Sequence, residues 1–329
     1  MQPDRPSSSS LPTQPAAAPA KASGVASSVC TDSTIEVAQG QDVAVRMYGR
    51  KKTGHTSPVV VHFHGGGFMS GDLDNGCTVA SLLESAGAVV VSVAYPLTPF
   101  PQPVDTGYGV LKWVHKHRTK LGGQGAAVYL AGEEAGGNLA AAVALMARDQ
   151  SHPPLAGQIL LSPMLDPCVG TASLREATGD STGCKWTEGW RNFLRCPRDA
   201  EHPYAVPAGA QRLAGLPPTL ILVGDTDPMH DEALAYAARL EAAGLSVTRH
   251  VFSKNPQWPD ALLQTGSHEC PCAAGAQEQF RQFFAATRSP VPSWRRPLTP
   301  SHPLTAADLH PGGGRETRAL REPHSLFAT

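Results

Sequence analysis

The sequence lacks any apolar run long enough to cross a bilayer, and its first residues lack the apolar core of a secretory signal. It also lacks an excess of charge of either sign, since its formal net charge is −1 and no basic stripe is present. Proteins that bind nucleic acid usually carry such a stripe. We therefore expect no membrane span, no nucleic-acid partner and a cytoplasmic location.

Cysteine is scarce, and its seven positions are scattered over the chain. An odd number at irregular spacing does not resemble a disulfide framework. The one close pair, Cys270 and Cys272, has no second Cys-x-x-Cys pair or His-x-His partner nearby to complete the four ligands that zinc prefers. We expect no metal and no cofactor.

Composition divides the chain into three parts. Residues 1–31 are rich in Ser, Pro and Ala, and residues 289–329 are rich in Pro, Arg and His with a run of three glycines. Such segments cannot bury enough apolar surface to order themselves, so we expect two disordered tails around a folded domain at 32–288.

Within this domain, short apolar runs alternate with segments of helical spacing. The expected strands are at 34–37, 42–48, 59–64, 88–95, 128–132, 158–161, 219–225 and 247–252. The expected helices are at 104–118, 135–148, 230–243 and 276–287. Strands that are nearly all apolar are typical of a parallel sheet buried on both faces. We predict an α/β fold with a mostly parallel sheet, helices on both faces, and a lid inserted at about 168–216, where the alternation stops.

The most informative stretch runs from Val128 to Ala142. A β-branched and aromatic run passes through Gly132-Glu133-Glu134-Ala135-Gly136 into an alanine-rich segment of helical spacing. A strand that turns sharply into a helix through Gly-x-x-x-Gly is typical of a nucleophile elbow, in which the middle residue is lifted into the active site. Here that residue is Glu134, where the G-x-S-x-G motif has serine.

Four stretches in the right order resemble the hormone-sensitive-lipase-like branch of the α/β-hydrolases. They are His64-Gly65-Gly66-Gly67-Phe68, the segment 132–138 that is similar to the family's G-[DE]-S-A-G-G-N, Ala214-Gly215-Leu216-Pro217-Pro218, and the segment 224–232. The resemblance covers about residues 33–288. It implies the α/β-hydrolase fold, carboxylic-ester hydrolysis, and a small apolar ester or a similar small molecule as the ligand.

The resemblance also assigns an oxyanion hole. Its donors would be the backbone amides of Gly66, Gly67 and Ala135, which in the family stabilise the negative oxygen of a tetrahedral intermediate. The alternative is that the glycines form only a tight turn.

Two of the three positions of the catalytic triad depart from the family pattern. Glu134 stands at the serine position, and Gln257 stands where the catalytic histidine is expected. Asp227 matches the acid that orients this histidine, although a helix N-cap before Pro228 would explain the same residue. His268 is the next candidate base, and the alternative is an exposed loop histidine.

The expected lid contains the aromatic residues Trp186, Trp190 and Phe193. They are candidates to line a ligand pocket, although aromatic side chains in a lid are as often simple packing.

Three functions remain open. The first is a hydrolase-fold protein with lost or residual esterase activity that binds a small ligand, in which the Glu134 carboxylate folds back and accepts the hydrogen bonds of the oxyanion hole. The second is an enzyme that uses Glu134 as nucleophile or base, resembling an epoxide hydrolase or a lyase, and it requires His268 in the site. The third is a structural or partner-binding protein. A homodimer is also left open.

Overall fold

The structure, a computed structural model, describes residues 30–168, 170–178, 185–253 and 271–288. The strands of its eight-stranded sheet are β1 (Cys30–Ala38), β2 (Gln41–Tyr48), β3 (Val59–Phe63), β4 (Val89–Val93), β5 (Val128–Glu133), β6 (Gly157–Leu161), β7 (Thr219–Gly224) and β8 (Val247–Phe252). The helices are α1 (Cys77–Ser85), α2 (Gln102–Gly122), α3 (Ala135–Asp149), α4 (Ala172–Thr178), α5 (Lys185–Phe193), α6 (Pro197–Ala200), the 3-10 turn η1 (Pro207–Gly209), α7 (His230–Ala242) and α9 (Pro271–Arg288).

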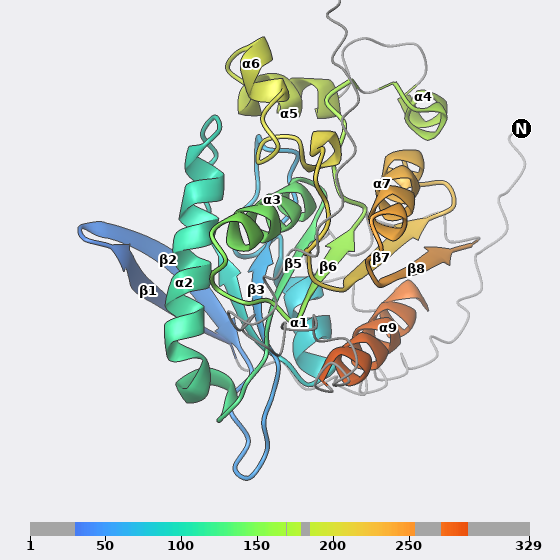
Figure 1. The fold of residues 1–329 in the computed structure, drawn as a ribbon. Coiled ribbons are helices and arrows are strands. Elements are labelled where there is room, and N and C mark those ends of the chain that lie inside the picture. The colour runs from blue at the N-terminus through green and yellow to red at the C-terminus, as the bar shows by residue number, and fades with distance from the viewer. Residues whose placement is uncertain (1–29, 169, 179–184, 254–270, 289–329) are drawn as a thin grey trace, which may run out of the picture. The chain divides into compact units, whose positions relative to one another are not determined.

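The sheet has the order β1-β2-β4-β3-β5-β6-β7-β8 (Figure 1). Strands β1, β2 and β4 pair antiparallel, and every pairing from β4 through β3 to β8 is parallel. The predicted α/β-hydrolase fold with a mostly parallel sheet is confirmed. Strand β5, which leads into the elbow, lies in the middle of the sheet between β3 and β6.

Helices cover both faces of the sheet. Helices α2, α3 and α7 pack on one face, and α1 and α9 lie on the other (Figure 1). Because successive side chains of a strand point to opposite faces, Val61 of β3 joins the first core cluster and its neighbour Val60 joins the second. Because helices cover both faces, every residue of the central strands β3, β4 and β5 is buried.

Three features differ from the sequence prediction. Helix α1 was not predicted, and its short sequence offers no side-chain cap and no acidic residue in its first turn. Strand β1 begins at Cys30, two residues before the predicted domain boundary. Cys272 in α9 is disulfide-bonded, which the scattered cysteine positions did not predict.

The described residues of segment 168–216 form α4, α5, α6 and η1 and contribute no strand to the sheet. The lid assignment of this segment stays a prediction. Apart from Cys30 and Thr31, the residues of the two predicted tails lie outside the described ranges. In the part of the chain that the structure describes, no helix is both long enough and apolar enough to cross a membrane.

Candidate active site

Glu134 occupies the sharp turn between β5 and α3. Its φ is 49° and its ψ is −116°, a backbone conformation that costs energy for a residue with a Cβ atom. The turn is held from both sides, because the Glu134 amide donates to the Leu161 carbonyl at 3.0 Å and its own carbonyl accepts from Met164 at 3.0 Å. A Cβ atom on Gly132 would lie only 2.1 Å from the carbonyl oxygen of Gly136, so the close approach requires glycine. This is the geometry of a nucleophile elbow.

The Glu134 side chain folds toward the glycine loop, the segment 64–68 that follows β3. Its Oε2 accepts a hydrogen bond of 3.0 Å from the Gly66 amide. Its Oε1 accepts from the indole N–H of Trp186 at 3.4 Å, and the Lys185 ammonium lies 3.8 Å from the same oxygen. Neither the Gly67 amide nor the Ala135 amide donates to this carboxylate in the hydrogen bonds of the described residues. One of the three expected oxyanion donors is therefore engaged by Glu134 itself.

A buried cluster of three polar side chains, His62, Glu133 and Ser92, supports the glycine loop. The Nε2 atom of His62 lies 2.8 Å from Oε2 of Glu133, and Nδ1 of His62 lies 2.9 Å from the Ser92 hydroxyl. The other oxygen of Glu133 accepts the Gly65 amide at 3.2 Å. All three side chains are buried, and each is satisfied by its neighbours. This cluster was not predicted from the sequence, although a histidine and a serine inside two apolar strands were a signal for it.

His64 and Tyr95 close the other side of the loop. Their rings stack with centroids 4.3 Å apart, and the Tyr95 hydroxyl donates to the His64 carbonyl at 2.8 Å. The Nδ1–H of His64 donates to the Gly65 carbonyl at 2.7 Å, since a carbonyl can only accept. Burial lowers the pKa of His64 and raises that of Tyr95. Both side chains are therefore neutral near pH 7, and they stabilise the loop by stacking and by hydrogen bonds to its carbonyls.

Helix α5 packs directly on the glycine loop. The ring of Phe68 stacks on Phe193 with centroids 4.1 Å apart, and Trp190 lies 5.3 Å from the same ring. The Asn192 side chain donates to the Phe68 carbonyl at 2.7 Å. Trp190 and Phe193 are buried by this packing, whereas Trp186 is half-buried and contacts Glu134.

Asp227 is fully buried in the turn between β7 and α7. Its Oδ1 accepts the Met229 amide at 2.8 Å. Helix α7 begins at His230 with Met229 as its N-cap residue and has no side-chain capping hydrogen bond, so the expected N-cap at Asp227 is not found. The Ser162 hydroxyl donates to its Oδ2. The role of Asp227 in orienting a histidine stays a prediction, because both Gln257 and His268 lie outside the described residues.

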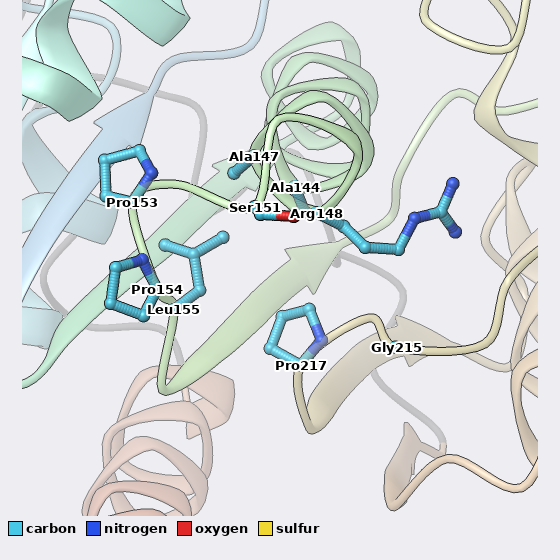
Figure 2. A pocket seen from close by; sticks show the side chains of 9 residues that line it. All are labelled: Ala144, Ala147, Arg148, Ser151, Pro153, Pro154, Leu155, Gly215 and Pro217. Carbon is cyan, nitrogen blue, oxygen red and sulfur yellow. The ribbon is translucent and has the colours of Figure 1, made fainter.

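A cavity of about 290 Å³ lies at the far end of α3 from the elbow (Figure 2). Its walls include Ala147, Arg148, Pro154 and Pro217. The Arg148 guanidinium is already engaged by Asp149 and by the Arg212 carbonyl. At 1.5 Å per residue along α3, the cavity is roughly 20 Å from Glu134 and is not part of this site. Among the described residues, no group of three or more His, Cys, Asp or Glu side chains could hold a metal ion.

Comparison with known proteins agrees with this geometry. Residues 60–257, more than half of the chain, match the family model described as alpha/beta hydrolase fold. The chain therefore belongs to the α/β-hydrolase-fold family. Its four motifs place it in the hormone-sensitive-lipase-like branch of that family.

Relatives that this chain resembles are named for two kinds of function. The chain is 35% identical over 201 residues to esterase LipI of Mycobacterium tuberculosis, covering 59% of this chain and 63% of LipI. It is also 35% identical over 211 residues to the gibberellin receptor GID1C of Arabidopsis thaliana, covering 59% of this chain and 60% of the receptor. The matched regions thus span less than two thirds of these relatives.

The crystal structure of a thermostable esterase from Pseudomonas putida ECU1011 superposes with a TM-score of 0.72. The two sequences are 29% identical, and the match covers 82% of this chain and 86% of the esterase. The chain is similar to carboxylesterases over its hydrolase domain.

Proposed function

We propose that this chain is an esterase-like α/β-hydrolase-fold protein that has lost ester hydrolysis and binds a small ligand at the former active site. The observation that carries the proposal is the position of Glu134, which lies at the elbow and accepts the Gly66 amide at 3.0 Å. Both the nucleophile position and one of the expected oxyanion donors are used by this one carboxylate.

The chemistry of acyl transfer explains the loss. Ester hydrolysis by this family needs a hydroxyl that a neighbouring base deprotonates. Enzymes that lose a triad residue accelerate the reaction only about 10³- to 10⁴-fold over the uncatalysed reaction in water. A carboxylate that attacked an ester would form an anhydride. The negative oxygen of a tetrahedral intermediate would also lie beside the Glu134 carboxylate, and like charges at such short distance repel strongly.

A ligand-binding role is supported by what the site retains. The glycine loop, its buried His62–Glu133 support and the packing of α5 on Phe68 are all in place. A site that loses its catalytic residues but keeps the surrounding structure is still preorganised, and such sites bind small molecules. One relative is named a gibberellin receptor, which supports ligand binding as a function of this chain. The ligand class, a cytoplasmic location and a homodimer stay predictions.

Labelling with a fluorophosphonate tests the proposal, because this probe bonds to an activated serine. The intact chain is expected to remain unlabelled at a concentration that labels an active esterase of the same branch completely. Labelling of any serine, such as Ser162 beside Asp227, would show that a working nucleophile exists and that the proposal is wrong.

A further inference from the structure

An ammonium group already lies in the site. Lys185, the first residue of α5, places its Nζ 3.8 Å from Oε1 of Glu134 and 4.6 Å from the centroid of the Trp186 ring. The lysine side chain is 58% exposed, whereas the Glu134 side chain is 7% exposed. The cation therefore reaches a buried carboxylate from the solvent side.

The groups that receive this ammonium are held by other contacts. One oxygen of Glu134 is fixed by the Gly66 amide, and the other is fixed by the Trp186 indole N–H. The face of the Trp186 ring is left for the cation. A carboxylate combined with the face of an indole is the usual recognition element for organic ammonium groups, because the ion pair and the cation–π attraction act together.

Among the described residues, no charged group other than Lys185 pairs with Glu134. The adjacent carboxylate of Glu133 is occupied by His62 and by the Gly65 amide. In the part of the chain that the structure describes, the hydrogen bonds to the Glu134 carboxylate come from two neutral N–H groups, the Gly66 amide and the Trp186 indole. Within the described residues, Lys185 is the cation that balances this carboxylate, and salt bridges with one exposed partner are weak.

We propose that Glu134 and Trp186 form a binding site for a small organic ammonium compound, and that Lys185 is a tethered occupant that such a ligand displaces. This inference rests on the proposed function, because it uses Glu134 as a fixed anion and not as a reacting group. The ligand class is a primary or secondary alkylammonium ion with a short apolar chain. An anionic or carbonyl ligand is disfavoured, because the Gly66 donor is already used.

Removal of the tethered competitor provides the test. A linked group competes at a high effective concentration, so its removal raises the apparent affinity of a free ligand. Binding of n-butylammonium is measured by isothermal titration calorimetry at constant ionic strength, with n-butanol as the neutral analogue of similar size. Lys185→Met keeps the apolar stem and removes the charge, and it is expected to tighten n-butylammonium binding about tenfold or more.

A matched control is present on α2. Lys112 also lies over an aromatic ring, 4.9 Å from the centroid of Tyr108, and forms no ion pair with Glu134 among the described residues. Lys112→Met is expected to leave n-butylammonium binding as in the wild type. Adding Glu134→Gln to Lys185→Met is expected to remove the preference for n-butylammonium over n-butanol, because glutamine keeps the Gly66 hydrogen bond without the charge.

Three outcomes would overturn the inference. They are undetectable n-butylammonium binding by Lys185→Met, equal affinity of that variant for n-butanol, and an unchanged preference after Glu134→Gln. Circular dichroism of each variant shows whether it is folded. None of these outcomes affects the proposed loss of ester hydrolysis, which fails only if a fluorophosphonate labels the chain or if esterase turnover is found.

Discussion

The Gly66 amide donates a hydrogen bond of 3.0 Å to Oε2 of Glu134, across 68 positions of the sequence. In the hydrolase motif this amide faces the oxygen of the substrate, and here it faces a side chain of the protein itself. The elbow turn brings the two groups together, because φ of 49° at Glu134 aims its side chain at the glycine loop.

Restoring the catalytic residues is expected to require two substitutions. Glu134→Ser alone is expected to hydrolyse p-nitrophenyl acetate within about tenfold of the background rate, because a serine without a base is a weak nucleophile. Adding Gln257→His is expected to raise kcat/KM by at least about 10²-fold over the single variant. Strong rescue by Glu134→Ser alone would instead show that another base, such as His268, is already in place.

Removing His62 is expected to destabilise the protein. His62→Leu leaves the buried Glu133 carboxylate without its ring partner, and breaking a buried pair in this way costs about 3–5 kcal/mol. The free energy of unfolding from urea titrations measures this loss. His55→Leu is the control, since His55 is exposed and should change stability by less than about 0.5 kcal/mol. Equal stability of the two variants would contradict the supporting role of His62.

The close packing of α5 on the glycine loop can be tested at Gly189. A Cβ atom at this position would lie 2.0 Å from the Gly67 carbonyl oxygen. Gly189→Ala is therefore expected to destabilise the protein by about 1–3 kcal/mol, although alanine favours a helix over glycine. Gly209→Ala is the control in the same inserted segment, because its nearest atom would be 3.8 Å away. A stabilising Gly189→Ala would show that α5 does not pack on the loop in solution.

Stability is expected to depend on pH through Glu232 of α7. Burial raises the pKa of Glu232 to about 8 from an ordinary value of 4.5, and the nearby Asp166 and Asp227 carboxylates add to the effect. Between these two values the folded state binds the proton and the unfolded state does not, so stability falls as pH rises toward 8. We expect a loss of about 1–3 kcal/mol between pH 5.5 and 8.5.

Two variants of α7 check the source of this pH dependence. Glu232→Gln should be more stable than the wild type at pH 8.5 and should show a flatter profile. The exposed Glu241→Gln should follow the wild-type profile. An unchanged profile in Glu232→Gln would rule out this carboxyl group as the cause.

The sequence predicted the fold well, because the signals that define it are local. The apolar runs around Val61 and Leu130 are buried on both faces, and they indicate a parallel sheet directly. Helix α1 was missed because it is short and lacks capping residues. The inserted helices could be located only as an interruption of the pattern, since their packing on Phe68 depends on contacts far apart in the sequence.

Only those residues of the candidate site that belong to a sequence motif could be predicted. The elbow position of Glu134 follows from the glycine spacing, and its turn toward Gly66 was expected from charge. The Lys185 contact could not be predicted, because nothing in the sequence indicates which residue of the segment 168–216 faces the elbow. The His62–Glu133 pair likewise joins two strands that are 71 positions apart.

The most direct measurement compares the wild type with Glu134→Ala in the hydrolysis of short p-nitrophenyl esters. Both proteins are expected to hydrolyse these esters at the same rate, close to that of the buffer alone. A wild-type rate well above this background that is abolished in Glu134→Ala would contradict this expectation, since Glu134 would then be a working catalytic group.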